Sequence, residues 1–551
     1  MIPPQFLRFL LPGANPLGFA GADFIVLGLA ALIVLVYLSR SRLICLAETL
    51  AGRPRTCVAL LFALPILLRL ALLSHHPIPT PRVADDFSYL LLGDTIAHFR
   101  LANAMQPMHR FFEAVFVLQT PSYSSIYPLG QGIALAFGQL LFRQPWAGVL
   151  ISAGALSAGC YWMLRAWVPP VWAFTGGLLA AIQFGPLSPW MNTYWGGAVS
   201  AIAGCLIFGA IPRRGRGAAI LLGLGLSLQL LTRPFEFVLL LPVVLLLRIP
   251  LRNLAIAALL LLPAAGLTLL QNQQVTGHWL ELPYQLSRYQ YGIPATFTLQ
   301  PNPVPHKPLT VEQQIDYDAQ VAVHSAGTET LGAYVNRLFV RVRFYGFFFS
   351  PPLYLILPAF LPALRERRFL LVAAALAMLW LGDNFYPYFY PHYVAVATCL
   401  FVLISIESLR QLTRLRIGTE LATLLLTLCL AFFIFWYGVY ATGNPNLLAA
   451  IGEENSWHQI NTGDPEGRIA INEALQRAPG QQLVFVHYSP QHGAREWLHN
   501  SADIDHSRVI WAIDLGDTEN AALRHYYPGR RVWLLEPDAR PPKLSESPAQ
   551  W

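Results

Sequence analysis

Residues 419–440 read TELATLLLTLCLAFFIFWYGVY, a stretch of 22 residues in which Glu420 is the only charged side chain. A helix needs about 20 mostly apolar residues to cross the hydrocarbon core of a bilayer, so this stretch is long enough to span a membrane. Three arginines stand just before it, at positions 410, 414 and 416. An apolar run with a basic border is typical of a membrane helix that begins in the cytoplasm.

The same pattern recurs along the whole chain. The 551 residues are 55% hydrophobic and only 12% charged, whereas soluble domains carry roughly 25% charge. So few charges cannot cover the surface of a soluble protein of this size, which argues against a soluble enzyme, a disordered chain and a nucleic-acid-binding protein. The candidate membrane segments are 22–39, 57–73, 145–164, 171–187, 197–212, 217–232, 235–248, 253–270, 346–363, 369–382, 393–408 and 419–440. The sequence therefore predicts an α-helical polytopic membrane protein with about 12 transmembrane helices, in which 217–232 and 235–248 form either two spans or one re-entrant hairpin.

Arginine is distributed unevenly between the two sets of connecting loops. One set carries 16 basic residues, whereas the alternating short connections carry a single one, Arg233. Because basic residues in short loops mark the cytoplasmic side, the Arg-rich loops are predicted to be cytoplasmic. The net charge of +7 then reflects topology and does not require an acidic partner. The long segments that this topology predicts outside the membrane are 74–144, 271–345 and 441–551.

The last outer segment, 441–551, differs in composition from the rest of the chain and has the character of a soluble domain. Stretches typical of strands alternate with helix-compatible ones, which is the pattern of a small α/β unit. The strand-like stretches are 483–488, 509–515 and 532–536, and the helical ones lie near 465–477 and 518–527. The predicted organisation is a membrane domain, 1–440, followed by a small extracytoplasmic α/β domain, 441–551.

The first outer segment contains Val83-Ala-Asp-Asp-Phe-Ser-Tyr89, two adjacent carboxylates close to a membrane run. Such a pair is costly near a membrane unless it is functional or well solvated. Asp85 can act as a general base, because a carboxylate can take a proton from an acceptor hydroxyl. Asp86 can orient the acceptor or help to hold a divalent ion. The alternative is that both residues stabilise the N-terminus of a helix, where Asp is favoured.

Three other outer stretches combine charged and aromatic side chains. In Leu231-Thr-Arg-Pro-Phe-Glu236, Arg233 is suited to bind phosphate, or forms a salt bridge with Glu236 that fixes the connection. In Tyr386-Pro-Tyr-Phe-Tyr-Pro-His-Tyr393, His392 and Tyr393 either bind a headgroup or belong to an interfacial aromatic belt. Arg288 stands among aromatic residues and either contacts a sugar or phosphate or lies on the membrane.

In their order along the chain, these motifs resemble the GT-C membrane glycosyltransferases. The resemblance covers roughly 57–408. Within the family, the motif pattern is most similar to those of the aminoarabinose lipid A transferases and the protein O-mannosyltransferases. The family's Asp-Glu-x-x-Tyr corresponds to Asp85-Asp-Phe-Ser-Tyr89, and Tyr127-Pro-Leu-Gly corresponds to its Tyr-Pro turn, which an amphipathic helix follows. The sequence departs from the family in three ways: Ile126 or Tyr127 stands where relatives often carry a Lys, Asp86 replaces the longer Glu, and one extra apolar run precedes the acidic loop.

The resemblance implies a donor sugar carried on a polyprenyl phosphate and a reaction at the outer membrane face. It implies Asp85 as the catalytic base with Asp86 as its partner. The residues expected to bind the donor phosphate or lipid are Arg233, Arg288, His392 and Tyr393, and those expected to bind substrate are Tyr89, Glu113 and Tyr127. The sequence establishes no cofactor; the alternative left open is a divalent metal ion, for which Asp85, Asp86 and Glu113 are the candidate ligands.

The function predicted from the sequence is therefore transfer of a sugar from a polyprenyl-phosphate donor to a lipid, glycan or protein acceptor, at the outer face of a bacterial inner membrane. A polytopic transporter or lipid flippase is the leading alternative. Transporters usually bind substrate near the bilayer midplane, whereas the polar motifs of this chain gather on one side. A non-catalytic scaffold is a further alternative, but it leaves Asp85, Asp86 and Arg233 unexplained.

Overall fold

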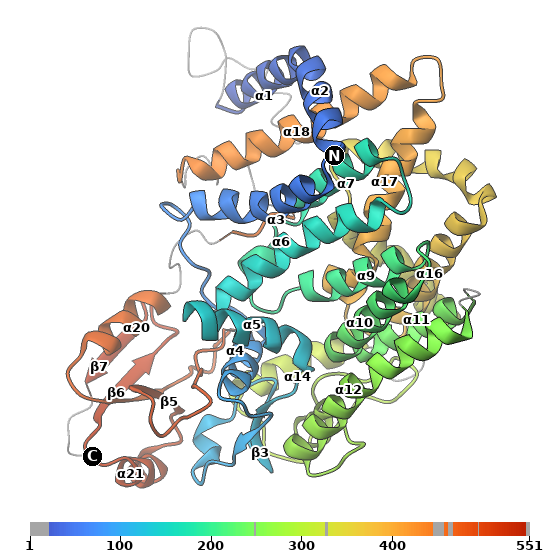
Figure 1. The fold of residues 1–551 in the computed structure, drawn as a ribbon. Helices are drawn as coiled ribbons and strands as arrows, with labels where there is room; N and C mark the ends of the chain where they lie inside the picture. Colours follow the sequence, from blue (N-terminus) through green and yellow to red (C-terminus); the bar gives the residue numbers. More distant parts are fainter. Residues whose placement is uncertain are drawn as a thin grey trace.

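The computed structural model describes residues 21–246, 250–324, 329–444, 457–460, 467–493 and 495–546 (Figure 1). Within these ranges the chain is mostly helical, with a small sheet domain near its C-terminal end. Arg248, which closes the predicted run 235–248, and the first residues of the helix predicted near 465–477 lie outside the described residues.

Each predicted apolar run contains a helix in the structure. The stretch 419–440 lies within α18, which runs from Gly418 to Ala441. The other runs correspond to α1 (Gly21–Leu38), α3 (Pro54–Ala71), α6 (Pro145–Leu164), α7 (Pro170–Gln183), α9 (Ala198–Ala210), α10 (Arg216–Thr232), α11 (Pro234–Leu246), α12 (Leu251–Thr276), η4 (Pro351–Arg365), α16 (Arg367–Asp383), and η5 (Pro391–Ala397) with α17 (Thr398–Leu412). The prediction of a polytopic helical membrane protein is confirmed at this level.

The predicted number of 12 spans is not confirmed. Among the described residues, 5 helices are long and apolar enough to cross a membrane, or up to 7 if each of two bent helix pairs counts as one span. The helices α7, α9, α10, α11 and α16 are no longer than 17 residues. At ~1.5 Å per residue, such helices reach at most about 25 Å, which is less than the ~30 Å hydrocarbon core.

One bent pair changes the shape expected for run 346–363. The helical segment Leu331–Phe348, which contains α15 (Leu331–Tyr345), meets η4 at an angle of 110°. Pro351 opens η4, and Pro358 and Pro362 lie inside it. Each proline lacks a backbone N–H and clashes with the preceding turn of an α-helix, so the segment forms a 3₁₀-helix instead.

Three Arg-rich connections lie together at one end of the helical bundle. A guanidinium N–H of Arg213 donates to the carbonyl oxygen of Trp162 at 2.6 Å, and one from Arg368 donates to the carbonyl of Trp167 at 3.1 Å. Arg165 stands between these two carbonyls in sequence and donates to the hydroxyl of Tyr161. These contacts bring the loops after α6, α9 and η4 to the same end, as the unequal distribution of arginine predicts.

The segments 74–144 and 271–345, which the sequence predicts outside the membrane, contain short helices and a small antiparallel sheet. The helices are α4 (Ala84–Ala97), α5 (Leu129–Phe142), α13 (Pro283–Tyr291) and α14 (Val311–His324), and the sheet has the order β1 (Asn103–Ala104), β3 (Ser122–Ser125), β2 (Val117–Leu118). Helix α5 packs against α4 and α6 and leaves large apolar side chains such as Phe137 and Leu141 exposed. An exposed apolar face of this kind suits the amphipathic helix expected after the Tyr127-Pro-Leu-Gly turn, which would lie at the membrane interface.

The C-terminal region forms a mixed four-stranded sheet of order β5-β4-β6-β7. The central strand β4 (Gln482–Val486) is parallel to β5 (Val509–Ile513) and β6 (Arg531–Glu536), while β7 (Lys543–Glu546) is antiparallel to β6. Helices α20 (Arg468–Arg477) and α21 (Asp517–Tyr526) accompany the sheet. The three predicted strands are confirmed. Strand β7 was not predicted, because its Lys-Leu-Ser-Glu sequence lacks β-branched and aromatic residues.

The C-terminal domain packs directly on the first outer segment (Figure 1). The rings of Phe111 and Phe485 meet edge to face in a shared apolar core. At its edge, Asp94 on α4 accepts a hydrogen bond of 2.7 Å from the backbone N–H of Ala502. The sheet domain and the outer loops therefore form one packed unit around the end of the bundle opposite the Arg-rich loops.

Candidate active site

A cavity of 840 Å³ opens where α4, the α10–α11 connection, α13, α14 and the segment 383–393 meet. It brings together residues that are far apart in the sequence. Eight of the predicted site residues line it: Asp85, Asp86, Tyr89, Tyr127, Arg233, Arg288, His392 and Tyr393. Glu113 is the predicted site residue that does not line it.

The two adjacent aspartates at the start of α4 have different environments. Asp86 is only 2% exposed, and its two carboxylate oxygens accept hydrogen bonds from the backbone N–H groups of Tyr194, at 2.7 Å, and Arg82, at 3.1 Å. Burial raises the pKa of Asp86 to about 6, although both hydrogen bonds act to lower it. Asp86, in the first turn of α4, thus ties the start of the helix to two neighbouring loops, which is a structural role at the helix N-terminus.

Within the described part of the chain, the carboxylate of Asp85 does not accept hydrogen bonds from the backbone of neighbouring loops as that of Asp86 does. Its Oδ1 atom accepts a hydrogen bond from the hydroxyl of Tyr127, and no side chain caps α4, whose N-cap residue is Val83. Burial raises the pKa of Asp85, while the Tyr127 hydroxyl and the positive charge of Arg233 oppose that rise. The Tyr127 ring is stacked on the ring of Tyr89 at 4.1 Å, and both rings are buried. The aromatic pair holds the hydroxyl, and with it the carboxylate, in one orientation.

Arg233 lies between α10 and α11 and faces the cavity. Its guanidinium carbon is 4.6 Å from the centre of the Tyr393 ring, a cation–π contact. The nearest carboxylate oxygen, from Glu236, is 3.7 Å away, which is longer than a hydrogen bond. Glu236 therefore balances the charge of Arg233 but leaves its N–H groups available to a ligand. The salt-bridge alternative and the phosphate-binding interpretation are compatible in this geometry.

Arg288 and His392 line the same cavity but differ in how far their polar atoms are already hydrogen-bonded within the protein. Arg288 donates through Nε to the carbonyl of Pro294 and through Nη2 to the carbonyl of Ala295, each at 2.9 Å. Its main contacts therefore fix the loop that follows α13. The His392 ring packs against Trp195 at 4.6 Å, and its buried Nδ1 atom has no hydrogen-bond partner in the part of the chain that the structure describes.

Glu113 belongs to a separate polar cluster. Its Oε2 atom accepts a 2.5 Å hydrogen bond from the hydroxyl of Tyr291, and His109 lies 3.8 Å from its other oxygen. The ligand set proposed for a metal, Asp85, Asp86 and Glu113, is therefore not assembled. Within the described ranges, no group of three or more His, Cys, Asp or Glu side chains is placed to hold a metal ion.

The structure adds acidic residues that the sequence did not single out. Glu312 and Asp316 reach the cavity from α14, Glu496 reaches it from the C-terminal domain, and Asp383 reaches it from the last residue of α16. Burial raises the pKa of Asp316 to about 7, and the nearby charges of Asp85 and Glu312 act in the same direction. The α14 side of the cavity is therefore rich in carboxyl groups.

A buried histidine connects this wall to the sheet domain. The ring of His492 is 1% exposed; its Nε2 atom is 2.6 Å from Glu312, and its Nδ1 atom is 2.7 Å from Asp538. Burial lowers the pKa of His492, but its hydrogen bonds to the two carboxylates outweigh burial and raise the pKa above the ordinary value. A protonated ring donates to both carboxylates at once, so His492 clamps the C-terminal domain to α14.

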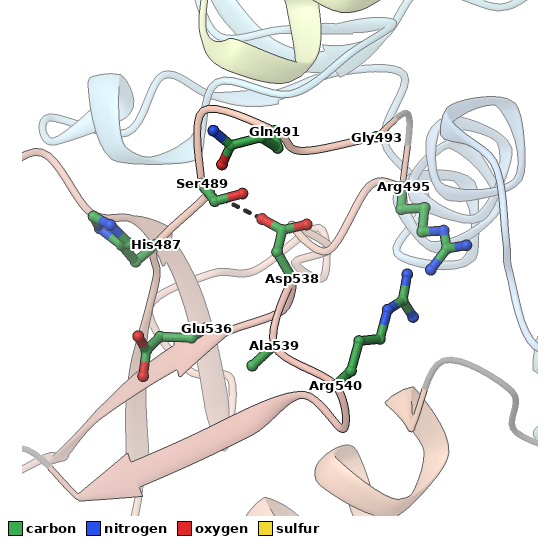
Figure 2. Close-up of a pocket in the computed structure, with 9 residues that line it drawn as sticks. All are labelled: His487, Ser489, Gln491, Gly493, Arg495, Glu536, Asp538, Ala539 and Arg540. Atoms are coloured by element: carbon green, nitrogen blue, oxygen red, sulfur yellow. Dashed lines mark hydrogen bonds between the residues drawn. The ribbon is translucent and has the colours of Figure 1, made fainter.

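Asp538 also borders a second, shallower cavity of 590 Å³ in the C-terminal domain (Figure 2). Figure 2 shows the side chains of Arg495 and Arg540 directed toward one another at its rim, and a hydrogen bond between Ser489 and Asp538 on its inner side. His492 thus lies between the two cavities, since Glu312 lines one and Asp538 lines the other.

The clamp should make docking of the C-terminal domain depend on pH. Because the folded-state pKa of His492 is raised above ~6.5, its stabilising contribution is complete below that pH and is lost as the pH rises through the folded-state pKa. Hydrogen-exchange protection factors of α14 and of β4 should therefore fall over a range of pH above about 6.5. His492→Gln should show low protection throughout this range. His506→Gln changes an exposed histidine and should behave as wild type; a flat wild-type profile would contradict the clamp.

The sequence matches no protein-family model and no curated protein. Solved structures match the fold over most of the chain. ArnT from Cupriavidus metallidurans in the apo state aligns with a TM-score of 0.50 and 12% identity, over 87% of this chain and 92% of ArnT. The chain has a GT-C fold.

Two further structures are similar to this GT-C chain. ArnT from the same organism bound to undecaprenyl phosphate aligns with a TM-score of 0.49 at 11% identity, with the same coverage of 87% and 92%. The archaeal oligosaccharyltransferase AglB from Archaeoglobus fulgidus, in complex with an inhibitory peptide and a dolichol-phosphate, has a TM-score of 0.39 at 11% identity, over 88% of this chain and 69% of AglB. The resemblance inferred from the order of the motifs is confirmed for the fold by the match to ArnT in the apo state.

Proposed function

We propose that this GT-C chain is a membrane glycosyltransferase that moves a sugar from a polyprenyl phosphate to an acceptor. The observation that carries the proposal is that Asp85 and Arg233, 148 residues apart, line one cavity and interact electrostatically. A base and a phosphate-binding cation on opposite sides of a donor are what sugar transfer from a lipid phosphate requires.

In the proposed reaction, Asp85 takes the proton of an acceptor hydroxyl or amine through the oxygen that Tyr127 leaves free. The acceptor atom forms a bond to the anomeric carbon as the bond from that carbon to the phosphate oxygen breaks, and the configuration inverts. The bonding pair leaves with the lipid phosphate, whose added negative charge Arg233 stabilises. Tyr127 is a positioning residue, because it acts through Asp85.

The likeness to ArnT supports a lipid-phosphate donor, because ArnT has the same fold and has been solved with undecaprenyl phosphate bound. The arrangement of arginine supports an outer site, because the cavity lies at the end of the bundle away from Arg165, Arg213 and Arg368. A bacterial inner membrane with the site on its outer face fits both. No part of the reaction needs a nucleic-acid partner or a metal ion.

The experiment is a transfer assay with purified full-length protein. Radiolabelled undecaprenyl-phosphate hexoses and pentoses are supplied with lipid, glycan and peptide acceptors, and label in the acceptor is counted. The proposal predicts time-dependent transfer from at least one donor. Vectorial movement of a labelled lipid across proteoliposomes without transfer would instead establish the transporter or flippase alternative.

A further inference from the structure

Two residues that line the main cavity keep a buried polar atom without a partner. Among the described residues, Oδ2 of Asp383 and Nδ1 of His392 are the cavity atoms in this condition. Asp383 is 3% exposed. Leaving a buried acceptor unsatisfied costs about 1–3 kcal/mol, so a retained one calls for an explanation.

The position of Asp383 adds a second cost. It is the last residue of α16, and a carboxylate at a helix C-terminus faces the negative end of the helix dipole. Its main-chain carbonyl already accepts a 2.8 Å hydrogen bond from Arg341, so the backbone there is anchored without the carboxylate. An acidic side chain at this point is therefore unfavourable for the empty protein.

Both atoms stand close to the proposed phosphate site. The charges of Glu236, Arg233 and Arg341 act on Asp383, and the charge of Arg233 also acts on His392. His392 is held by ring contacts on two sides, with Trp195 at 4.6 Å and Tyr390 at 6.0 Å. The unpartnered atoms thus belong to a rigid, partly aromatic surface beside Arg233.

The chemistry of a lipid-phosphate sugar decides which part can satisfy Asp383. The polyprenyl tail has no hydrogen-bond donors. An ionised phosphate offers only acceptors, and a carboxylate repels it. Within this donor, the sugar hydroxyls are the groups that can donate a hydrogen bond to Oδ2 of Asp383.

We infer that Asp383 and His392 form the subsite for the donor sugar, in which sugar hydroxyls bind Oδ2 of Asp383 and Nδ1 of His392 while Arg233 holds the adjoining phosphate. This inference rests on the proposed function. Such a subsite would let the cavity distinguish the sugar-bearing lipid from the lipid phosphate that remains after transfer. The lipid phosphate has no sugar hydroxyl to donate a hydrogen bond to Asp383, and it places additional negative charge beside that side chain.

The test compares two ligands on the same protein. Affinities for undecaprenyl phosphate and for the panel of undecaprenyl-phosphate hexoses and pentoses are measured with full-length protein in nanodiscs. In Asp383→Asn, the ratio of sugar-donor affinity to undecaprenyl phosphate affinity should fall at least 10-fold, because the sugar loses a charged acceptor while the phosphate loses a repulsive neighbour. His392→Phe keeps a ring against Trp195 and should lower the same ratio.

The matched control is Tyr345→Phe. The hydroxyl of Tyr345 is another buried, unpartnered polar atom near Asp383, but Tyr345 does not line the cavity, so the ratio should not change. Equal loss of both ligands in Asp383→Asn would overturn the inference, since Asp383 would then act only through Arg233. An unchanged ratio would overturn it too, and if Asp383→Asn does not fold, His392→Phe decides. A wild-type protein that binds neither lipid would overturn the proposed function together with the inference.

Discussion

Replacing Asp85 by Asn is expected to lower the turnover of sugar transfer by at least about 100-fold, because a general base contributes about 10²–10⁴ to a rate. The side chains have nearly the same shape, and the Tyr127 hydroxyl can still donate to the amide oxygen. Expression and affinity for undecaprenyl phosphate should therefore be close to those of wild type. The measurement is single-turnover transfer, with lipid binding determined on the same preparation.

Asp318→Asn is the matched control for Asp85. It removes one carboxylate from the exposed face of α14, only two residues from Asp316, and should leave turnover unchanged. A pH profile provides an independent readout. Turnover of the wild type should rise with pH as Asp85 loses its proton, and in Tyr127→Phe this rise should move to higher pH, because the Tyr127 hydroxyl lowers the pKa of Asp85. Full activity of Asp85→Asn would refute the assigned base.

Replacing Arg233 by Gln is the second change with a large expected effect. Removing one donor that stabilises developing charge costs about 10²–10³ in kcat, and Arg233 supplies both N–H groups and a full charge. Arg233→Lys retains the charge beside Glu236 but loses the planar fork, so it should be intermediate between Gln and wild type. The same loss of charge should raise the pKa of Asp85, and the Gln variant should therefore need a higher pH for its residual turnover.

Arg110→Gln is the control for the removal of an arginine. Arg110 lies on the same side as the cavity but is exposed, and it pairs with Glu519 at 3.2 Å. Exposed pairs of this kind contribute about 0–1 kcal/mol, so this variant should keep wild-type turnover. If Arg110→Gln lost as much activity as Arg233→Gln, the effect would reflect the general charge of this surface. Phosphate binding by Arg233 would then be wrong.

The helices were predictable because hydrophobicity is a local property of the sequence. The lengths of the spans were harder to predict. The number of apolar residues suggests one straight helix over 346–363, but Pro358 and Pro362 in that run prevent a regular α-helix. Strand β7 could not be predicted from the local sequence. It is defined by its pairing with β6, for example of Leu544 with Leu535, and not by local strand propensity.

The candidate site was predictable where a charge interrupts an apolar region, as at Asp85 and Arg233. One further signal was readable in the sequence. Glu312, Asp316 and Gln320 follow one another at intervals of four residues, and all three face the cavity from one side of α14. Glu496 could not be found in this way, because acidic residues are ordinary in a soluble segment and its place in the cavity depends on how the sheet domain packs.

The presence of Glu496 in the cavity wall has a consequence for how the protein is made. Asp85 leaves the ribosome about 400 residues before Glu496, and at ~5–20 residues per second the two are separated by roughly 20–80 s. During that interval the membrane helices can insert while the cavity still lacks one wall. We therefore expect a chain interrupted after α18 to insert its membrane helices with this side of the cavity still open.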